Sequence, residues 1–219
     1  MGVMPVTKVI EIPHGKLGVW NLTEPADKLA GIFRFTEEEK TAFQNIKNEI
    51  RKQEFLAVRL LLENLLGKKA EINYNKHRKP QIKNKELKIS ISHCAGLVVV
   101  LVSHSQAGID VENIYRNTER IAPRFLSEKE YDETENSPNP SLSRILYWCA
   151  KEAAFKFSEH PEIEFKTHIQ ISPFKINSTG GTFRGSLCKK EPTRQLAFQY
   201  FFFGNNVVVY CVEQEIMKK

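Results

Sequence analysis

The chain has 219 residues, which suits one large domain or two small ones that share a core. Hydrophobic residues make up 41% and charged residues 26%, proportions that exclude extensive disorder. The net charge of +6 favours a polyanionic partner such as nucleic acid, a phosphorylated cofactor or an acidic protein. A merely solvated basic surface would give the same charge.

The four cysteines form no CxxC pair and no zinc-ligand spacing. Free thiols in apolar or mixed stretches are typical of a reducing compartment, so we expect a cytoplasmic protein. No apolar run approaches the length of a transmembrane helix, and residues 1–12 lack the long apolar stretch of a signal peptide. We therefore expect no membrane association.

The first predicted elements are one or two short strands over residues 3–22, where apolar and polar positions alternate. Thr36 and Glu39 have the spacing of a helix cap and its capping box. From there one helical pattern continues to about Leu66, and Gly67 ends it. The pattern in the N-terminal part of the chain therefore predicts short strands followed by one long helix.

A predicted hairpin follows this helix. Its first strand is Leu87–Ser92, its turn is Ala95-Gly96, and its second strand is the apolar run Leu97–Val102. Helical patterns then cover roughly 118–134 and 141–158. The middle of the chain thus changes from strands to helices.

The last part of the chain predicts strands near 165–172, 174–177 and 182–187, then a hairpin over 196–212 that turns at Gly204-Asn205-Asn206. The buried run of this hairpin, Val207–Val212, resembles Leu97–Val102 and follows it by about half the chain. Any two buried strands can look alike, but each run closes a series of a helix followed by a hairpin.

We therefore predict an α+β fold of two pseudo-symmetric halves of similar topology. The halves would be residues 1–105 and 106–219, packed together with the active site between them.

The first candidate for chemistry is Gly108-Ile109-Asp110-Val111-Glu112. In a strand, Asp110 and Glu112 share one face while Ile109 and Val111 point into packing. Two adjacent carboxylates repel each other unless a cation lies between them, and oxygen ligands favour a hard ion such as Mg²⁺. An exposed acidic strand edge is the simpler alternative.

The second candidate is a helical stripe. Trp148, Glu152 and Lys156 recur at a spacing of four residues, so an acid and a base lie one turn apart. An ordinary surface ion pair would have the same spacing. His93, beside Ser92 at a strand end, could contact a phosphate or move a proton, or it could simply be hydrogen-bonded in place.

Basic residues gather in two places. Lys76, His77, Arg78 and Lys79 precede Pro80, and the first long helix carries several more, including Arg51. Such charges are usually solvated, but some of them could form a phosphate-binding wall.

Together these segments resemble the Sfp-type 4′-phosphopantetheinyl transferases. Residues 108–112 are similar to that family's G-[IV]-D-x-E strand, and residues 148–156 to its W-x-x-K-E-[AS]-x-x-K helix. Ile91-Ser92-His93 and Lys79-Pro80 resemble two further signatures, and 124–130 resembles the stretch between strand and helix. The resemblance covers roughly 35–213 and departs at Arg78, where the family often has glycine.

The resemblance implies Mg²⁺-dependent transfer of the phosphopantetheine arm of coenzyme A to a serine of an acyl or peptidyl carrier protein, with release of adenosine 3′,5′-bisphosphate. It implies metal ligation by Asp110, Glu112 and Glu152, and catalysis by Glu152, Lys156 and His93. Coenzyme A would be bound by Arg51, Lys79, Pro80, Ser92, His93, Asp110 and Lys156. The base that activates the serine is left open between Glu152 and a metal-bound hydroxide.

The carrier protein would be acidic, and Ile114–Leu126, with its arginines and apolar residues, is a plausible docking surface. We expect a monomer that binds no nucleic acid. One alternative is a basic nucleic-acid-binding module, although no RNA-binding aromatic signature is present. Another is a non-catalytic relative that only binds coenzyme A or a carrier.

Overall fold

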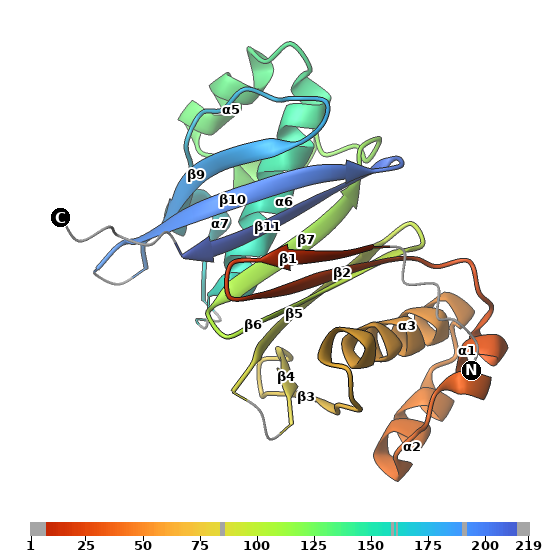
Figure 1. The fold of residues 1–219 in the computed structure, drawn as a ribbon. Coiled ribbons are helices and arrows are strands. Elements are labelled where there is room, and N and C mark those ends of the chain that lie inside the picture. Colours follow the sequence, from red (N-terminus) through yellow and green to blue (C-terminus); the bar gives the residue numbers. More distant parts are fainter. Residues whose placement is uncertain (1–7, 84–85, 159, 161, 190–191, 214–219) are drawn as a thin grey trace.

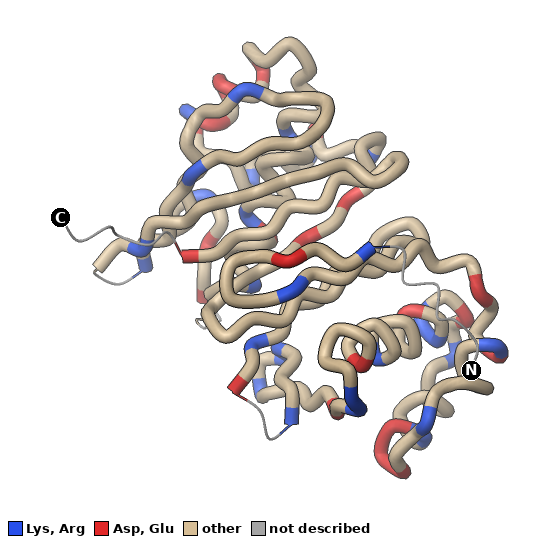
Figure 2. Tube along the Cα trace, viewed as in Figure 1, with Lys and Arg blue, Asp and Glu red and all other residues tan. Residues whose placement is uncertain are grey.

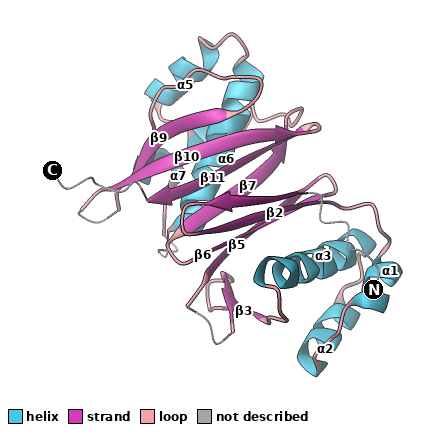
Figure 3. Ribbon diagram, viewed as in Figure 1, coloured by secondary structure: helices cyan, strands magenta, loops and turns pink. Residues whose placement is uncertain are grey.

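The computed structural model describes residues 8–83, 86–158, 160, 162–189 and 192–213. Within this part of the chain it has two larger antiparallel sheets, each packed against a long helix (Figure 1 and Figure 3). The mixture of helices and antiparallel sheets confirms the predicted α+β class. The prediction for the first residues of the chain, up to residue 7, lies outside the described residues.

The N-terminal sheet has the strand order β1-β2-β6-β5. Its strands are β1 (Lys8–Ile12), β2 (Gly15–Asn21), β5 (Lys88–Cys94) and β6 (Leu97–Ser103). The predicted hairpin of β5 and β6 is confirmed, with Gly96 at a φ of 80° in its turn. Strand β6 is buried along its whole length because β2 and β5 flank it within the sheet and apolar layers cover both faces.

Three helices precede β5, namely α1 (Ala26–Ile32), α2 (Glu37–Asn45) and α3 (Glu49–Leu66). The capping box of Thr36 and Glu39 is confirmed. The single helix predicted from Thr36 to Leu66 is wrong, because the chain leaves the helix at Ile46 and starts again after Asn48. The Asn48 side chain caps α3 by accepting a hydrogen bond from the Arg51 amide at 3.0 Å. A small sheet of β3 (Ile72–Tyr74) and β4 (Pro80–Ile82) follows.

The C-terminal sheet has the strand order β7-β11-β10-β9-β8. Its strands are β7 (Ala107–Asn113), β8 (Ile169–Ile171), β9 (Gly181–Leu187), β10 (Arg194–Phe203) and β11 (Asn206–Glu213). The predicted last hairpin, β10 with β11, is confirmed.

Two predicted elements before β9 differ from the structure. Residues 165–168 form a short helix, α7 (Phe165–His168), and only then does β8 begin. The strand predicted over 174–177 is absent, because the Phe174 ring stacks on Phe183 at 4.1 Å and covers the sheet instead of joining it.

Besides α7, the helices of the second half are α4 (Ala122–Phe125), α5 (Glu128–Glu135) and α6 (Pro140–Phe157). The helix predicted over 118–134 is therefore two shorter ones, because Ser127 forms a capping box that starts α5. The prediction for 141–158 is confirmed by α6, which Asn139 caps.

The layers run in the order α3, N-terminal sheet, C-terminal sheet, α6 (Figure 1). Val98 and Val100 of β6 pack toward α3, whereas Val99 and Leu101 pack with Ile109 of β7 between the sheets. The opposite face of the second sheet packs on α6. A strand alternates its side chains between two faces, so each buried strand serves two cores.

Residues 104–106 connect β6 to β7, and the predicted boundary between 1–105 and 106–219 lies in this link. Each half contributes one larger sheet and one helix of 18 residues. A duplication of one half to give the other stays a prediction. No helix in the described part of the chain is long and apolar enough to cross a membrane.

Candidate active site

Strand β7 runs unusually close to α6, and Gly108 makes this approach possible. A Cβ atom at Gly108 would lie 1.9 Å from the Ala153 carbonyl oxygen and 2.7 Å from the Phe157 nitrogen. Both of those atoms belong to the backbone and cannot move aside. The glycine that begins the acidic motif therefore sets the distance between the strand and the helix that carry the candidate residues.

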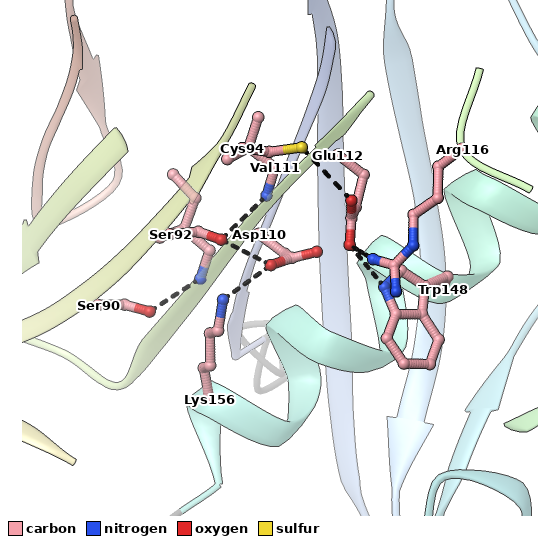
Figure 4. Close-up of polar contacts among 10 residues, drawn as sticks. Ser90, Ser92, Cys94, Asp110, Val111, Glu112, Arg116, Trp148 and Lys156 are labelled. Atoms are coloured by element: carbon pink, nitrogen blue, oxygen red, sulfur yellow. Dashed lines mark hydrogen bonds and ion pairs between the residues drawn. The ribbon is translucent and has the colours of Figure 1, made fainter. Parts of the chain in front are cut away.

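Asp110 is almost completely buried, with 4% of its surface exposed. Its Oδ1 accepts hydrogen bonds from Ser92 Oγ at 2.8 Å and from Lys156 Nζ at 2.7 Å (Figure 4). Its Oδ2 is buried and accepts no hydrogen bond within the described part of the chain, although the buried Cys149 thiol interacts with this carboxylate. A buried carboxylate oxygen without a partner is costly, so this atom is a candidate for binding a cation.

Glu112 lies on the same face of β7, as predicted, and three side chains contact its carboxylate (Figure 4). Oε1 accepts hydrogen bonds from Trp148 Nε1 at 2.9 Å and from Arg116 Nη1. Oε2 is contacted by Cys94 Sγ at 3.6 Å. The sequence placed Trp148 only on the same helical stripe as Glu152 and Lys156, and its bond to Glu112 was missed.

Glu152 and Lys156 do not form the ordinary ion pair with each other that their spacing also allowed. Lys156 instead pairs with Asp110 on the facing strand. Glu152 makes no hydrogen bond or ion pair with any residue that the structure describes. Burial raises the pKa of Glu152, and the nearby charge of Asp110 raises it further, although Lys156 and Arg116 oppose the shift. The carboxylate is therefore a stronger proton acceptor than an exposed glutamate.

The predicted metal ligands fit Mg²⁺ in donor type, since Asp110, Glu112 and Glu152 all offer carboxylate oxygens. Asp110 Oδ2 and the carboxylate oxygens of Glu152 accept no hydrogen bonds from described residues, so they could coordinate a cation. In their present positions, however, no three His, Cys, Asp or Glu side chains among the described residues form a group that could hold a metal ion. Lys156 on Asp110 and Arg116 on Glu112 neutralise two of the three carboxylates instead.

His93 belongs to a cluster that joins β5 to α3. Its Nδ1 lies 3.0 Å from Glu54 Oε1, and its Nε2 lies 3.3 Å from Arg51 Nη1. Burial lowers the pKa of His93; Glu54 raises it, and Arg51 and Lys156 lower it. The neutral ring can donate from Nδ1 to Glu54 and accept from Arg51 at Nε2. Glu54 was missed by the sequence analysis, although it follows Arg51 by one helical turn.

A cavity of about 1040 Å³ opens beside these residues. The predicted residues that line it are Lys79, Pro80, His93, Glu152 and Lys156. Its outer wall is basic and includes Lys76, His77, Arg78 and Lys88 around the β3–β4 turn and β5, where Figure 2 shows lysine and arginine in blue. Lys79 Nζ donates to the Lys156 carbonyl oxygen at 3.1 Å and so ties this wall to α6.

Three predicted binding residues do not line the cavity, namely Arg51, Ser92 and Asp110. The Arg51 guanidinium contacts the His93 ring, and the Ser92 hydroxyl donates a hydrogen bond to Asp110.

Lys151 is a further residue of the helical motif, and its role is structural. Its side chain is fully buried, and Nζ donates to Glu130 Oε2 at 2.7 Å and to the carbonyl oxygens of Phe165 and Ile169 at 2.8 Å each. Glu130 Oε1 accepts from the Ile171 amide at 2.9 Å. Since every donor of the ammonium has a partner, this pair holds α5, α6 and β8 together.

Residues 106–211 match the model of a family described as the 4′-phosphopantetheinyl transferase superfamily. The matching segment runs from the start of β7 into β11 and includes Asp110, Glu112, Glu152 and Lys156. A search of curated proteins finds no match. The family match supports transfer of a 4′-phosphopantetheinyl group in general, which involves coenzyme A and a carrier protein.

Proposed function

We propose that the protein is an Sfp-type transferase that moves the 4′-phosphopantetheine arm of coenzyme A to a serine of an acyl or peptidyl carrier protein. The observation that carries the proposal is the superfamily match over 106–211, which contains Asp110, Glu112, Glu152 and Lys156. The position of Glu152 and Lys156 at a large cavity with a basic wall supports it.

In this reaction the serine oxygen attacks the β-phosphorus of coenzyme A. The bond from that phosphorus to the bridging oxygen breaks, and adenosine 3′,5′-bisphosphate leaves with the electron pair. Positioning and charge neutralisation supply most of the catalysis in such transfers. The protein must therefore hold a polyanion, offset charge at the leaving oxygen and accept the serine proton.

The basic wall supplies the charge. Lys76, Arg78, Lys79 and Lys88 border the cavity and would attract the phosphates of coenzyme A. Lys156 would contact the diphosphate, exchanging its bond to Asp110 for one to a phosphate oxygen. His93, which lines the cavity, and Arg51, which contacts its ring, would bind another phosphate of coenzyme A.

Glu152 would accept the serine proton. It lines the cavity, has no hydrogen-bond partner among the described residues, and has a raised pKa because it is buried. All three properties suit a general base. Asp110 and Glu112 would hold Mg²⁺, which when bound supplies positive charge at the diphosphate. Glu152 would be a third ligand of the ion only if another group accepted the serine proton.

The carrier would dock on Ile114–Leu126. Tyr115 is 74% exposed there, and Arg116, Arg120 and Arg124 add positive charge, whereas Phe125 and Leu126 are buried and belong to the core. An acidic carrier would be attracted to such a surface. We also propose that the protein acts as a monomer in the cytoplasm, which agrees with the lack of a disulfide bond among the cysteines that the structure describes.

The test is to incubate the protein with coenzyme A, Mg²⁺ and several apo carrier proteins, and to weigh the carriers by mass spectrometry. We expect a carrier to gain one phosphopantetheinyl group, and Asp110→Ala or Glu152→Ala to abolish the gain. No gain in any carrier would contradict the proposal. Tight, steeply salt-dependent binding of nucleic acid, unaffected by coenzyme A, would favour the nucleic-acid alternative instead.

A further inference from the structure

Strands β5 and β7 are the facing edges of two different sheets. In the described part of the chain β5 pairs only with β6, and β7 pairs only with β11. The two edges nevertheless lie against each other. The contacts between them are made by the side chains of alternate residues of β5, which are Ser90, Ser92 and Cys94.

These three side chains contact successive residues of β7 (Figure 4). Ser90 Oγ accepts a hydrogen bond from the Ile109 amide at 3.0 Å. Ser92 Oγ accepts from the Val111 amide at 3.4 Å and donates to Asp110 Oδ1 at 2.8 Å. The next contact along the strand is that of Cys94 Sγ with Glu112 Oε2, at 3.6 Å.

The contacts serve two purposes at once. The serine oxygens satisfy buried amides of β7 that would otherwise lose a hydrogen bond on burial, so they fix how far β7 slides along β5. The hydroxyl proton of Ser92 and the thiol proton of Cys94 point to one oxygen each of Asp110 and Glu112. Each acidic side chain is thus held from the N-terminal half of the chain.

We propose that Ser92 and Cys94 are positioning residues that orient Asp110 and Glu112, and that Ser90 fixes the register of β7. The role of the two acids rests on the proposed function, whereas the contacts themselves do not. This role for Ser92 differs from the one that the family resemblance implies, which is to bind coenzyme A. Its hydroxyl is buried and engaged, and the residue does not line the cavity.

The first measurement is amide hydrogen exchange in the full-length protein. Ser90→Ala should make the Ile109 amide exchange about tenfold faster, and Ser92→Ala should do the same for Val111, because each amide loses its acceptor. Ser103→Ala is the matched control, since Ser103 is also buried and accepts from a backbone amide, that of Ser105 at 3.0 Å. It should leave both β7 amides unchanged.

The second measurement is Mn²⁺ binding, followed by electron paramagnetic resonance without coenzyme A or carrier. Partners that orient metal ligands typically contribute about 10–100-fold to metal affinity, so Ser92→Ala should weaken Mn²⁺ binding by a factor in this range. Ser92→Thr keeps the hydroxyl and should restore most of the affinity. Cys94→Ala should weaken binding less, and Cys94→Ser should retain it.

Kinetics separate positioning from phosphate binding. If Ser92 is a positioning residue, Ser92→Ala should lower kcat and leave the KM for coenzyme A nearly unchanged. A rise in KM with kcat unchanged would overturn the proposal, and so would unaltered Mn²⁺ affinity and unaltered Val111 exchange in Ser92→Ala. If Ser92→Ala does not fold, the Cys94→Ala and Cys94→Ser pair decides, because neither variant removes a bond to the backbone.

The two proposals fail in different ways. An unaltered protein that modifies no carrier would contradict the proposed function, while the exchange of Ile109 and Val111 would still test the contacts of β5. Normal transfer by a Ser92→Ala protein with unaltered Val111 exchange would overturn only the positioning role.

Discussion

Trp148 Nε1 lies 2.9 Å from Glu112 Oε1, and the guanidinium of Arg116 lies 5.1 Å from the centre of the same indole ring. Arg116 also pairs with Glu112. The carboxylate, the guanidinium and the indole ring thus each contact the other two at the end of β7. A change in the partner of Glu112 must therefore alter the surroundings of Trp148.

Replacing Arg116 should strengthen the binding of a divalent cation. Arg116 neutralises Glu112, so a cation has to displace it, and Arg116→Gln removes that competitor. Because the arginine is partly exposed, we expect a gain of only about two- to fivefold in Mn²⁺ affinity. Mn²⁺ titration followed by Trp148 fluorescence, in a Trp20→Phe background, measures it directly.

Arg120→Gln is the control for this prediction, since it removes one positive charge from the same exposed segment without a contact to Glu112. It should change the Mn²⁺ affinity much less. Weaker binding in Arg116→Gln would contradict the expected competition.

Gly108→Ala should destabilise the fold, because the new methyl group would meet the backbone of α6 at Ala153. Overpacking against an immobile neighbour costs about 1–3 kcal/mol, and we expect the upper part of that range in urea unfolding. Gly31→Ala is the control, since nothing lies within 4 Å of its added Cβ and it lies in α1. It should be neutral or stabilise the protein by up to about 1 kcal/mol. Equal stability of the two variants would show that β7 does not pack so closely on α6.

Lys151→Met should lower the stability of the protein more than the replacement of an exposed lysine does. It would leave Glu130 as a buried charge without its cation, which typically costs about 3–5 kcal/mol. Thermal unfolding of Lys151→Met beside the exposed control Lys166→Met measures the difference. If the cost comes from the unpaired charge of Glu130, adding Glu130→Gln to Lys151→Met should recover part of the lost thermal stability. A further loss of similar size in the double variant would contradict this explanation.

His93 should make the protein less stable at mildly acidic pH. Burial holds the pKa of His93 below its ordinary value of 6.5, so the unfolded chain takes up its proton first. The contribution of His93 is complete above pH 6.5 and is lost as the pH falls toward the lowered pKa. His93→Gln should therefore reduce the loss of stability between pH 7 and about pH 5, measured by urea unfolding. His77 is exposed, so His77→Gln should lose as much stability between pH 7 and about pH 5 as the unaltered protein. An unchanged dependence of stability on pH in His93→Gln would contradict the prediction.

Local patterns predicted a large part of this fold. The capping box at Thr36, the hairpin turn at Gly96 and the shared face of Asp110 and Glu112 depend on neighbours within a few residues, and each is found in the structure. The breaks at Asn48 and Ser127 were missed, because a side-chain cap competes with a helical pattern that continues through it.

The partners of the candidate residues could not be predicted in the same way. Lys156 looked like a partner of Glu152, one turn away on the helix, yet it pairs with Asp110, which is 46 positions away in the sequence. Trp148 and Lys151 likewise find their partners on other elements. Spacing describes one element at a time, whereas these contacts depend on how close β7 lies to α6.

The link of residues 104–106 is the only covalent connection between the part of the chain that carries Ser92 and the part that carries Asp110. Neither part alone holds a complete set of candidate residues, but the two share an extensive buried interface between their sheets. Separate polypeptides ending and beginning in this link would therefore have to find each other before any chemistry could occur. Fused to two other proteins, they would form a complementation reporter whose signal depends on the meeting of its fusion partners.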